Sequence, residues 1–212
     1  MSDIYKLDRA ASALFDERGR SFDPIVRRWR ENPGASTGRG ETIAATAAVT
    51  WLQKESGAPL RIPVGVIGPR DATPAQLAAA ERIGVGLAAM GLTVVCGGRA
   101  GVMHAVCEGV RRGGGLSIGL LPEPSAEWAN PHVTVALATD IGEARNALIA
   151  RASLCLVAIG DSYGTLSEVA LGLQFGKLVI GVEGAARVEG VRHVPTTEDV
   201  LALVARVVLD AP

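Results

Sequence analysis

From residue 61 onward, two kinds of apolar pattern alternate along the chain. Longer segments carry apolar residues at helical spacing and predict helices at 74–91, 102–115, 142–152, 165–176 and 197–209. Short, continuous apolar runs without period-two alternation predict buried strands at 62–68, 92–98, 116–122, 132–139, 153–160 and 178–182. Strand alternating with helix predicts an α/β fold, a Rossmann-like doubly wound, mainly parallel sheet with helices on both faces.

The first sixty residues do not follow this pattern. They are polar and rich in turn residues, and they predict a hairpin between 13–15 and 21–22 followed by an Ala-rich helix over 42–55. We therefore expect an N-terminal extension at 1–60 and a Rossmann-like nucleotide-binding domain at 61–212. The extension shows no recognisable chemistry, and a lid, a dimer contact and an N-terminal brace are all open roles for it.

Composition narrows the class of protein. Hydrophobic residues make up 48% of the 212 residues and 26 are glycine, which fits a well-cored α/β fold whose tight turns need glycine. The net charge is −1 and no basic stripe with interleaved aromatics is present, so we expect no nucleic-acid partner. The start has no apolar signal-peptide core, and no apolar run is long enough to span a membrane. We expect a cytoplasmic protein with no membrane partner.

The cysteines and histidines do not suggest a metal site. The three cysteines include no CxxC pair, and two of them lie in apolar runs, so buried thiols are expected. His104, His132 and His193 are scattered, without an acidic cluster at ligand spacing, so we expect no metal ion. A G-x-S-x-G elbow is also absent, which argues against a serine hydrolase.

Three glycine-rich turns, at 64–74, 96–105 and 159–170, follow predicted strands and lead into predicted helices. Ligands of open parallel sheets bind at the carboxyl ends of the strands. Glycine lets the backbone approach a ligand closely, and the first amides of a helix bind anions. Neither a GxGxxG fingerprint nor a P-loop lysine is present. We therefore expect a small phosphate-bearing ligand at these turns, although plain turns also explain the first two.

The third turn supports two interpretations. A phosphate at Gly164 and Thr165 would meet the positive end of a helix dipole. Thr165-Leu166-Ser167-Glu168 is also a T-x-x-E capping box, in which Thr165 caps the helix and Glu168 bonds back to its amide. The spacing leaves both open. Asp161 in this turn would repel a phosphate unless it points away or pairs with Arg99 or Arg145.

These residues resemble the LOG-like (SLOG) superfamily, whose members were often mislabelled lysine decarboxylases. Residues 159–168 match the GTxxE half of its PGGxGTxxE pattern, with IGD in place of PGG, and 97–103 match its GGxxGVM element. Arg145 and Glu168 stand at the spacing of the arginine and glutamate that the family pairs. Asn146 after Arg145, and GPRDATP at 68–74, are closer to the branch that includes the molybdenum cofactor carrier proteins.

The resemblance covers 64–182 and implies a Rossmann-like fold, a homodimer or higher homo-oligomer, and a phosphate-bearing ligand over the GTxxE turn. One implied function is a phosphoribohydrolase that cleaves the N-glycosidic bond of a nucleoside 5′-monophosphate, with Arg145 and Glu168 as catalytic residues. The other is a carrier that binds a pterin phosphate, such as molybdenum cofactor, without changing it. A merely structural Arg145–Glu168 ion pair is a third possibility. No cofactor is required beyond a bound nucleotide or pterin phosphate.

The residues expected to contact the ligand come from the three turns and from the position after Arg145. They are Gly68, Gly97, Gly98, Arg99, Gly101, Met103, Asn146, Gly160, Ser162, Tyr163, Gly164 and Thr165.

Overall fold

The computed structural model describes residues 4–31 and 40–210. The chain forms two compact units, one of residues 1–60 with 202–212 and one of residues 61–201. The last helix, α6 (Thr197–Asp210), begins in the second unit, and its later residues belong to the first. Within the described ranges, no helix is both long enough and apolar enough to cross a membrane.

The second unit is built on a seven-stranded parallel sheet with the order β12-β11-β10-β6-β7-β8-β9. Its strands are β6 (Val64–Ile67), β7 (Val94–Cys96), β8 (Ser117–Leu121), β9 (Val135–Ala138), β10 (Leu156–Ile159), β11 (Val179–Val182) and β12 (Val191–His193). The chain enters at the central strand β6, adds strands on one side, and returns to place β10 on the other. The strand order therefore reverses between β6 and β10.

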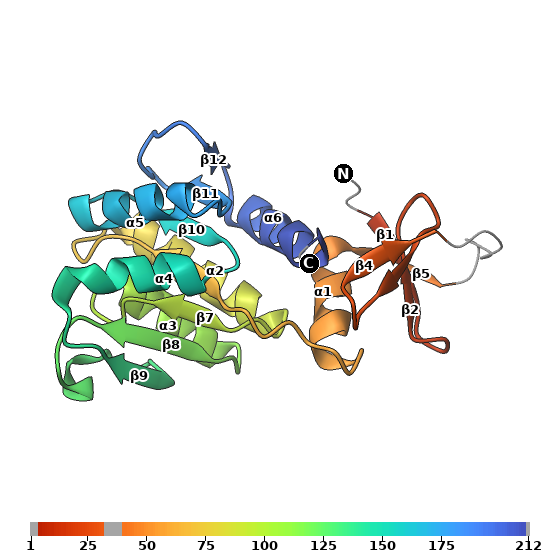
Figure 1. Cartoon of the computed structure of the whole chain (residues 1–212), viewed down its shortest axis with the longest axis horizontal. Coiled ribbons are helices and arrows are strands. Elements are labelled where there is room, and N and C mark those ends of the chain that lie inside the picture. The colour runs from red at the N-terminus through yellow and green to blue at the C-terminus, as the bar shows by residue number, and fades with distance from the viewer. Residues whose placement is uncertain (1–3, 32–39, 211–212) are drawn as a thin grey trace. The chain divides into compact units, whose positions relative to one another are not determined.

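Helices cover both faces of this sheet. They are α2 (Pro74–Ala89), α3 (Val102–Arg112), α4 (Asn146–Ala152), α5 (Tyr163–Gln174) and the start of α6, with short 3₁₀ turns η1 (Ala126–Trp128) and η2 (Gly142–Arg145). Figure 1 shows α4 and α5 on one side of the sheet and α2 and α3 on the other. The predicted Rossmann-like α/β fold is thus confirmed.

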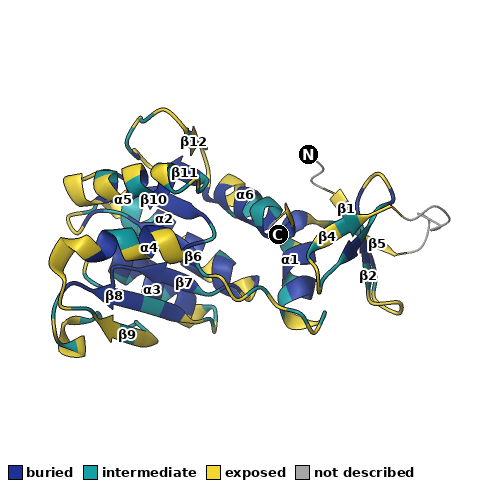
Figure 2. Cartoon of the chain, in the orientation of Figure 1, coloured by how far each residue is buried: buried dark blue, intermediate teal, exposed yellow. Residues whose placement is uncertain are grey.

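The core of this unit follows the apolar runs of the sequence. Every residue of β6, β10 and β11 is buried, as expected for strands covered on both faces. Figure 2 shows the buried residues gathered on the central strands and on the inner sides of the helices. The edge strand β12 is largely exposed and carries Arg192 and His193, so its sequence gave no strand signal.

The N-terminal unit has a five-stranded antiparallel sheet with the order β4-β3-β2-β1-β5. Its elements are β1 (Ile4–Asp8), β2 (Ala13–Phe15), β3 (Ser21–Asp23), β4 (Arg28–Arg30), β5 (Glu41–Ala44) and helix α1 (Ala45–Lys54). The predicted hairpin is confirmed as β2 and β3. The predicted helix at 42–55 begins later, at Ala45, because residues 41–44 pair with β1.

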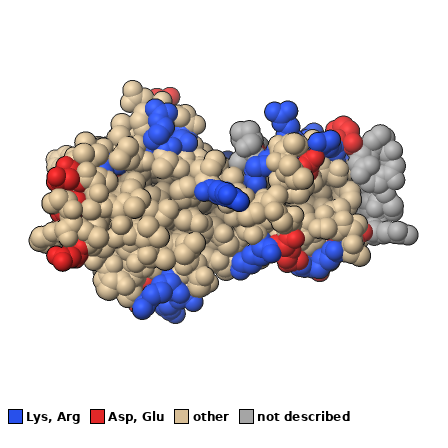
Figure 3. All heavy atoms as spheres, turned by 60° about the horizontal axis from the view of Figure 1, so that its bottom comes forward, with Lys and Arg blue, Asp and Glu red and all other residues tan. Residues whose placement is uncertain are grey.

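Charged side chains form no continuous stripe on the face of the protein drawn in Figure 3. Lys and Arg lie there in separate small groups, with uncharged side chains between them. This distribution agrees with a net charge close to zero.

Candidate functional site

A pocket of about 600 Å³ lies where the strand order reverses, at the carboxyl ends of β6 and β10. Four segments line it: the turn after β6, the start of α3, the η2–α4 junction and the start of α5. The lining residues are Gly68, Pro69, Arg70, Asp71, Met103, Glu143, Arg145, Asn146, Asp161, Ser162, Tyr163, Gly164, Thr165, Ser167 and Glu168. This is the position where open α/β sheets bind their ligands.

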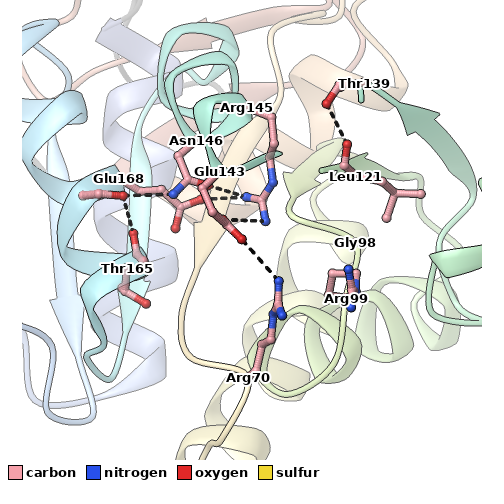
Figure 4. A network of polar contacts seen from close by, with 12 residues as sticks. Arg70, Gly98, Arg99, Leu121, Thr139, Glu143, Arg145, Asn146, Thr165 and Glu168 are labelled. Atoms are coloured by element: carbon pink, nitrogen blue, oxygen red, sulfur yellow. Dashed lines mark hydrogen bonds and ion pairs between the residues drawn. The ribbon is translucent and has the colours of Figure 1, made fainter. Parts of the chain in front are cut away.

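Arg145 and Glu168 meet at the bottom of this pocket. Their side chains are 4% and 7% exposed, and Nη1 of Arg145 lies 3.4 Å from Oε1 of Glu168. The same Nη1 donates to Oδ1 of Asn146 at 2.7 Å, and Nδ2 of Asn146 donates to Oγ of Ser167 at 2.9 Å. Figure 4 shows the guanidinium directed at these partners. Because the pair is buried, it is not a surface ion pair of the weak kind.

The second glycine turn makes room for Arg145. A Cβ on Gly97 would lie 2.7 Å from Nη2 of Arg145 and 2.7 Å from the sulfur of Met103. Gly97 therefore packs against the guanidinium without lining the pocket itself. The absence of a side chain at this position lets a buried arginine approach the end of β7.

Gly101 joins the second glycine turn to the first. It has φ +67° and ψ −132°, a conformation that residues with a Cβ rarely adopt. A Cβ here would lie 2.2 Å from the carbonyl oxygen of Arg70, and the following Val102 N–H donates to the carbonyl of Pro69 at 3.1 Å. The turn after β6 is thus held against the start of α3 by backbone contacts that need glycine.

Three further predicted ligand residues, Gly98, Arg99 and Gly160, also lie outside the pocket lining. Arg99 forms an ion pair with Glu123, and its guanidinium lies 5.7 Å from the ring centroid of Trp128. Gly160 has φ +68° and packs against the side chain of Gln76. With Gly97 and Gly101, these residues shape the turns, whereas the other predicted residues line the pocket.

The start of α5 corrects one interpretation of the sequence. The helix begins at Tyr163, and the N-cap is Ser162, whose Oγ accepts from the Thr165 N–H at 3.2 Å. Thr165 is therefore the third residue of the helix, and the T-x-x-E capping box is wrong. Glu168 is directed toward Arg145 instead. A Cβ on Gly164 would meet only Oγ of Ser162, at 3.8 Å, so the first turn of α5 is open to the pocket.

Acidic and basic side chains both line the pocket. Glu143 has one oxygen 3.5 Å from Nη2 of Arg70 and the other 3.9 Å from Nη2 of Arg145 (Figure 4). Glu143 and Arg70 are 65% and 47% exposed, so this contact is weak and easily exchanged. Asp161 is exposed in the pocket lining, while Arg99 pairs with Glu123 and Arg145 with Glu168 rather than with Asp161.

Burial raises the pKa of Glu168 to about 8, from an ordinary value of 4.5. The nearby Arg145 guanidinium opposes this rise in pKa, and the Glu143 carboxylate adds to it. Desolvation outweighs the single ion pair because the carboxyl is almost fully removed from water. Burial therefore favours the protonated form of Glu168, whereas the contact with Arg145 favours the ionised form.

This raised pKa predicts a stability that depends on pH. Between pH 4.5 and about 8, the folded chain keeps a proton on Glu168 that the unfolded chain has released, so the free energy of unfolding falls as the pH rises. The slope from this group is at most about 1.4 kcal/mol per pH unit. Urea unfolding of wild type and Glu168→Gln across this range should show wild type losing stability relative to the variant. A difference that does not change with pH would contradict the buried, protonated carboxyl.

Comparison with known proteins assigns the chain to a family. Residues 61–207 match the model of the SLOG cluster4 family. The chain belongs to the SLOG cluster4 family. The glycine turns suggested a resemblance to the LOG-like (SLOG) superfamily, and this match confirms it.

Relatives of the chain include proteins with two different described functions. A molybdenum cofactor binding protein from Rippkaea orientalis has a TM-score of 0.67 and 32% identity, covering 70% of this chain and 99% of that one. The molybdenum cofactor carrier protein of Chlamydomonas reinhardtii has a TM-score of 0.64, also with 32% identity, over 69% and 98% of the two chains. A probable cytokinin riboside 5′-monophosphate phosphoribohydrolase of Oryza sativa subsp. japonica is 35% identical over 53% of this chain and 52% of its own.

Sequence reasoning missed part of the pocket lining. Arg70 and Asp71 lie in the GPRDATP turn, of which only Gly68 was expected to contact a ligand. Glu143 and Ser167 stand two residues before Arg145 and one before Glu168. The sequence signal for these two residues was their closeness to Arg145 and Glu168. Whether their side chains point into the pocket depends on the geometry of η2 and on the residue at which α5 begins.

Proposed function

We propose that the 61–201 unit binds a small molecule that carries a phosphate and a nucleotide-like or pterin-like ring. The observation that carries this proposal is the pocket at the reversal of strand order, into which the first turn of α5 opens. The descriptions of the relatives support it, since molybdenum cofactor and a riboside 5′-monophosphate both combine a phosphate with a heterocyclic ring.

The phosphate would occupy the space above Gly164. The amides at the start of a helix lack helical partners and form the positive end of its dipole, so they favour an anion. Gly164 puts no side chain in the way, and Ser162 contributes a hydroxyl at the same place. Arg70, in the turn after β6, supplies a positive charge. Its contact with Glu143 is weak and can be exchanged for a contact with the phosphate.

The ring would occupy the remainder of the pocket. Its volume of about 600 Å³ lies within the range of sites that hold small organic ligands. Tyr163 is 95% exposed at the pocket edge and offers an aromatic face, and Met103 supplies a buried polarizable wall.

Hydrolysis of an N-glycosidic bond is the second candidate, because Arg145 and Glu168 both line the pocket. A carboxylate near the ribose would stabilise the positive charge that develops as the bond breaks. Burial of Glu168 raises its pKa and opposes that charge. We favour binding without turnover, because this chain covers almost the whole length of the molybdenum cofactor binding and carrier proteins but only about half of the phosphoribohydrolase.

Glu143→Gln is expected to tighten binding of a phosphorylated ligand several-fold. The substitution removes a carboxylate that competes for Arg70 and Arg145 and repels a phosphate, while keeping the shape of the side chain. Isothermal titration of wild type and variant with the same nucleoside 5′-monophosphate measures the change. Unchanged or weaker binding in Glu143→Gln would show that the phosphate does not approach these two arginines.

Incubation with a panel of nucleoside 5′-monophosphates and pterin phosphates, at pH 7 and pH 9, distinguishes the two functions. Chromatography detects released base, and a thermal shift detects binding. We expect a thermal shift without base release at pH 7. Base release that disappears in Glu168→Gln would establish the hydrolase instead. Neither a shift nor release with any compound would contradict both functions.

A further inference from the structure

A second cluster of side chains with ligand chemistry lies outside the pocket. His104 and Glu108 on α3 and His132 in the segment before β9 each offer one potential ligand atom, and the three atoms lie within 4.8 Å of one another. The two imidazole rings make an edge contact, with their centroids 4.6 Å apart. None of these side chains takes part in the Arg145–Glu168 network.

The sequence explains why two of these residues share a direction. His104 and Glu108 are four residues apart on one helix, so their side chains lie on the same face, one turn apart. Placing two ligands at this spacing on a helix is a common way to present them to one metal ion. The third residue, His132, is distant in the sequence, and only the fold brings it to this helix face.

The backbone around His132 is held firmly. Its N–H donates to Oδ1 of Asn130 at 3.1 Å, and its carbonyl accepts from Oγ of Ser117 at 3.3 Å. Asn130 in turn donates from its backbone N–H to the carbonyl of Gly98, at 2.9 Å, and from Nδ2 to the carbonyl of Arg99, at 3.1 Å. The imidazole is thus presented by a preorganised segment, as an efficient ligand must be.

One atom of the cluster indicates a missing partner. Nδ1 of His132 is buried and has no hydrogen-bond partner. Buried polar atoms are nearly always paired, so an orphaned nitrogen on a ring that lies beside a histidine and a carboxylate indicates a missing partner.

We propose that His104, Glu108 and His132 form a binding site for one divalent first-row transition metal ion, with Zn²⁺ as the best match. Two imidazoles and one carboxylate are a ligand set that Zn²⁺ takes up, with the fourth position left to water. Mg²⁺ and Ca²⁺ prefer oxygen ligands and are poor matches for two imidazoles.

The site would connect metal binding to the ligand pocket. An ion held between α3 and His132 would fasten the segment containing Asn130, which holds the carbonyls of Gly98 and Arg99. These residues belong to the glycine turn in which Gly97 packs on Arg145. The metal would therefore stabilise the turn that positions the pocket arginine, without touching the pocket ligand.

Equilibrium dialysis of the full chain against Zn²⁺, followed by elemental analysis, tests the proposal. We expect one Zn²⁺ per chain, at least a tenfold loss of affinity in His132→Ala and Glu108→Gln, and no change in His193→Ala, which removes an exposed histidine on β12. Circular dichroism without metal shows which variants fold. Should His132→Ala fail to fold, the nearly isosteric Glu108→Gln decides the question. Equal binding in that variant and wild type would overturn the site.

Substitution with Co²⁺ identifies the ligands by spectroscopy. Visible d–d absorption without a sulfur charge-transfer band is expected for the two histidines and the carboxylate. The buried thiols of Cys96 and Cys107, 3.5 Å apart on β7 and α3, are the alternative soft ligands nearby. A sulfur charge-transfer band that survives in Glu108→Gln would overturn the proposal and assign the metal to these cysteines.

Discussion

Replacing Arg145 with methionine is expected to destabilise the protein by about 3 kcal/mol and to abolish ligand binding. The guanidinium is 4% exposed and connects Asn146 and Glu168, so its loss leaves buried polar groups without their partner. Methionine keeps the length of the side chain and limits the cavity. Urea unfolding measures the stability, and isothermal titration with the mononucleotide panel measures the binding.

Arg70→Met is the matched control for the stability part of this prediction. Arg70 lines the same pocket but is 47% exposed and makes only a weak contact with Glu143, so its loss should change stability by about 0.5 kcal/mol or less. The effect of Arg145→Met should also increase above about pH 8, where Glu168 ionises in the wild type, because the variant loses the charge that opposes the raised pKa of Glu168. Equal stability of the two variants would contradict a buried network around Arg145.

Gly101→Ala is expected to cost about 3 kcal/mol and to weaken ligand binding strongly. An alanine at φ +67° is strained, and its Cβ would lie 2.2 Å from the backbone oxygen of Arg70, which cannot move aside without shifting the turn after β6. That turn lines the pocket, so the expected distortion reaches the ligand. Thermal and urea unfolding, together with the same titration, measure the effect.

Gly114→Ala tests a positive φ that has no close contact beside it. Gly114 also has a positive φ, +71°, but a Cβ there meets nothing within 4 Å. This variant should cost only the conformational strain, about 1 kcal/mol, and leave binding unchanged. If Gly101→Ala were no more harmful than Gly114→Ala, the close backbone contact between the first two glycine turns would be disproved.

The parallel sheet could be predicted from sequence because its central strands are buried on both faces and therefore read as unbroken apolar runs. The edge strand β12 and the strands β1, β4 and β5 of the N-terminal sheet could not. These strands are three to five residues long and partly exposed, so they carry mixed polar and apolar residues. Their formation depends on pairing with distant strands, which local patterns do not encode.

The site was predictable where a motif fixes the local backbone. Arg145 and Glu168 were expected together, and the structure brings them together in the pocket. Gly97 and Gly101 were expected to contact the ligand, but they make room for Arg145 and for the backbone of Arg70. The sequence does not show which atoms pack against these glycines, so the fold was needed to assign this role. The capping box was wrong for a similar reason, because the N-cap of α5 is Ser162, three residues before Thr165.

The most direct test of the proposed phosphate site is isothermal titration of Gly164→Asp with the tightest-binding compound of the panel, beside Gly164→Ala. Space above Gly164 is open, and an acidic residue in the first turn of a helix is favourable, so the variant should fold with at least wild-type stability. Its carboxylate would occupy the phosphate position. We expect loss of binding in Gly164→Asp and near-normal binding in Gly164→Ala. Wild-type affinity in Gly164→Asp would contradict a phosphate bound at the start of α5.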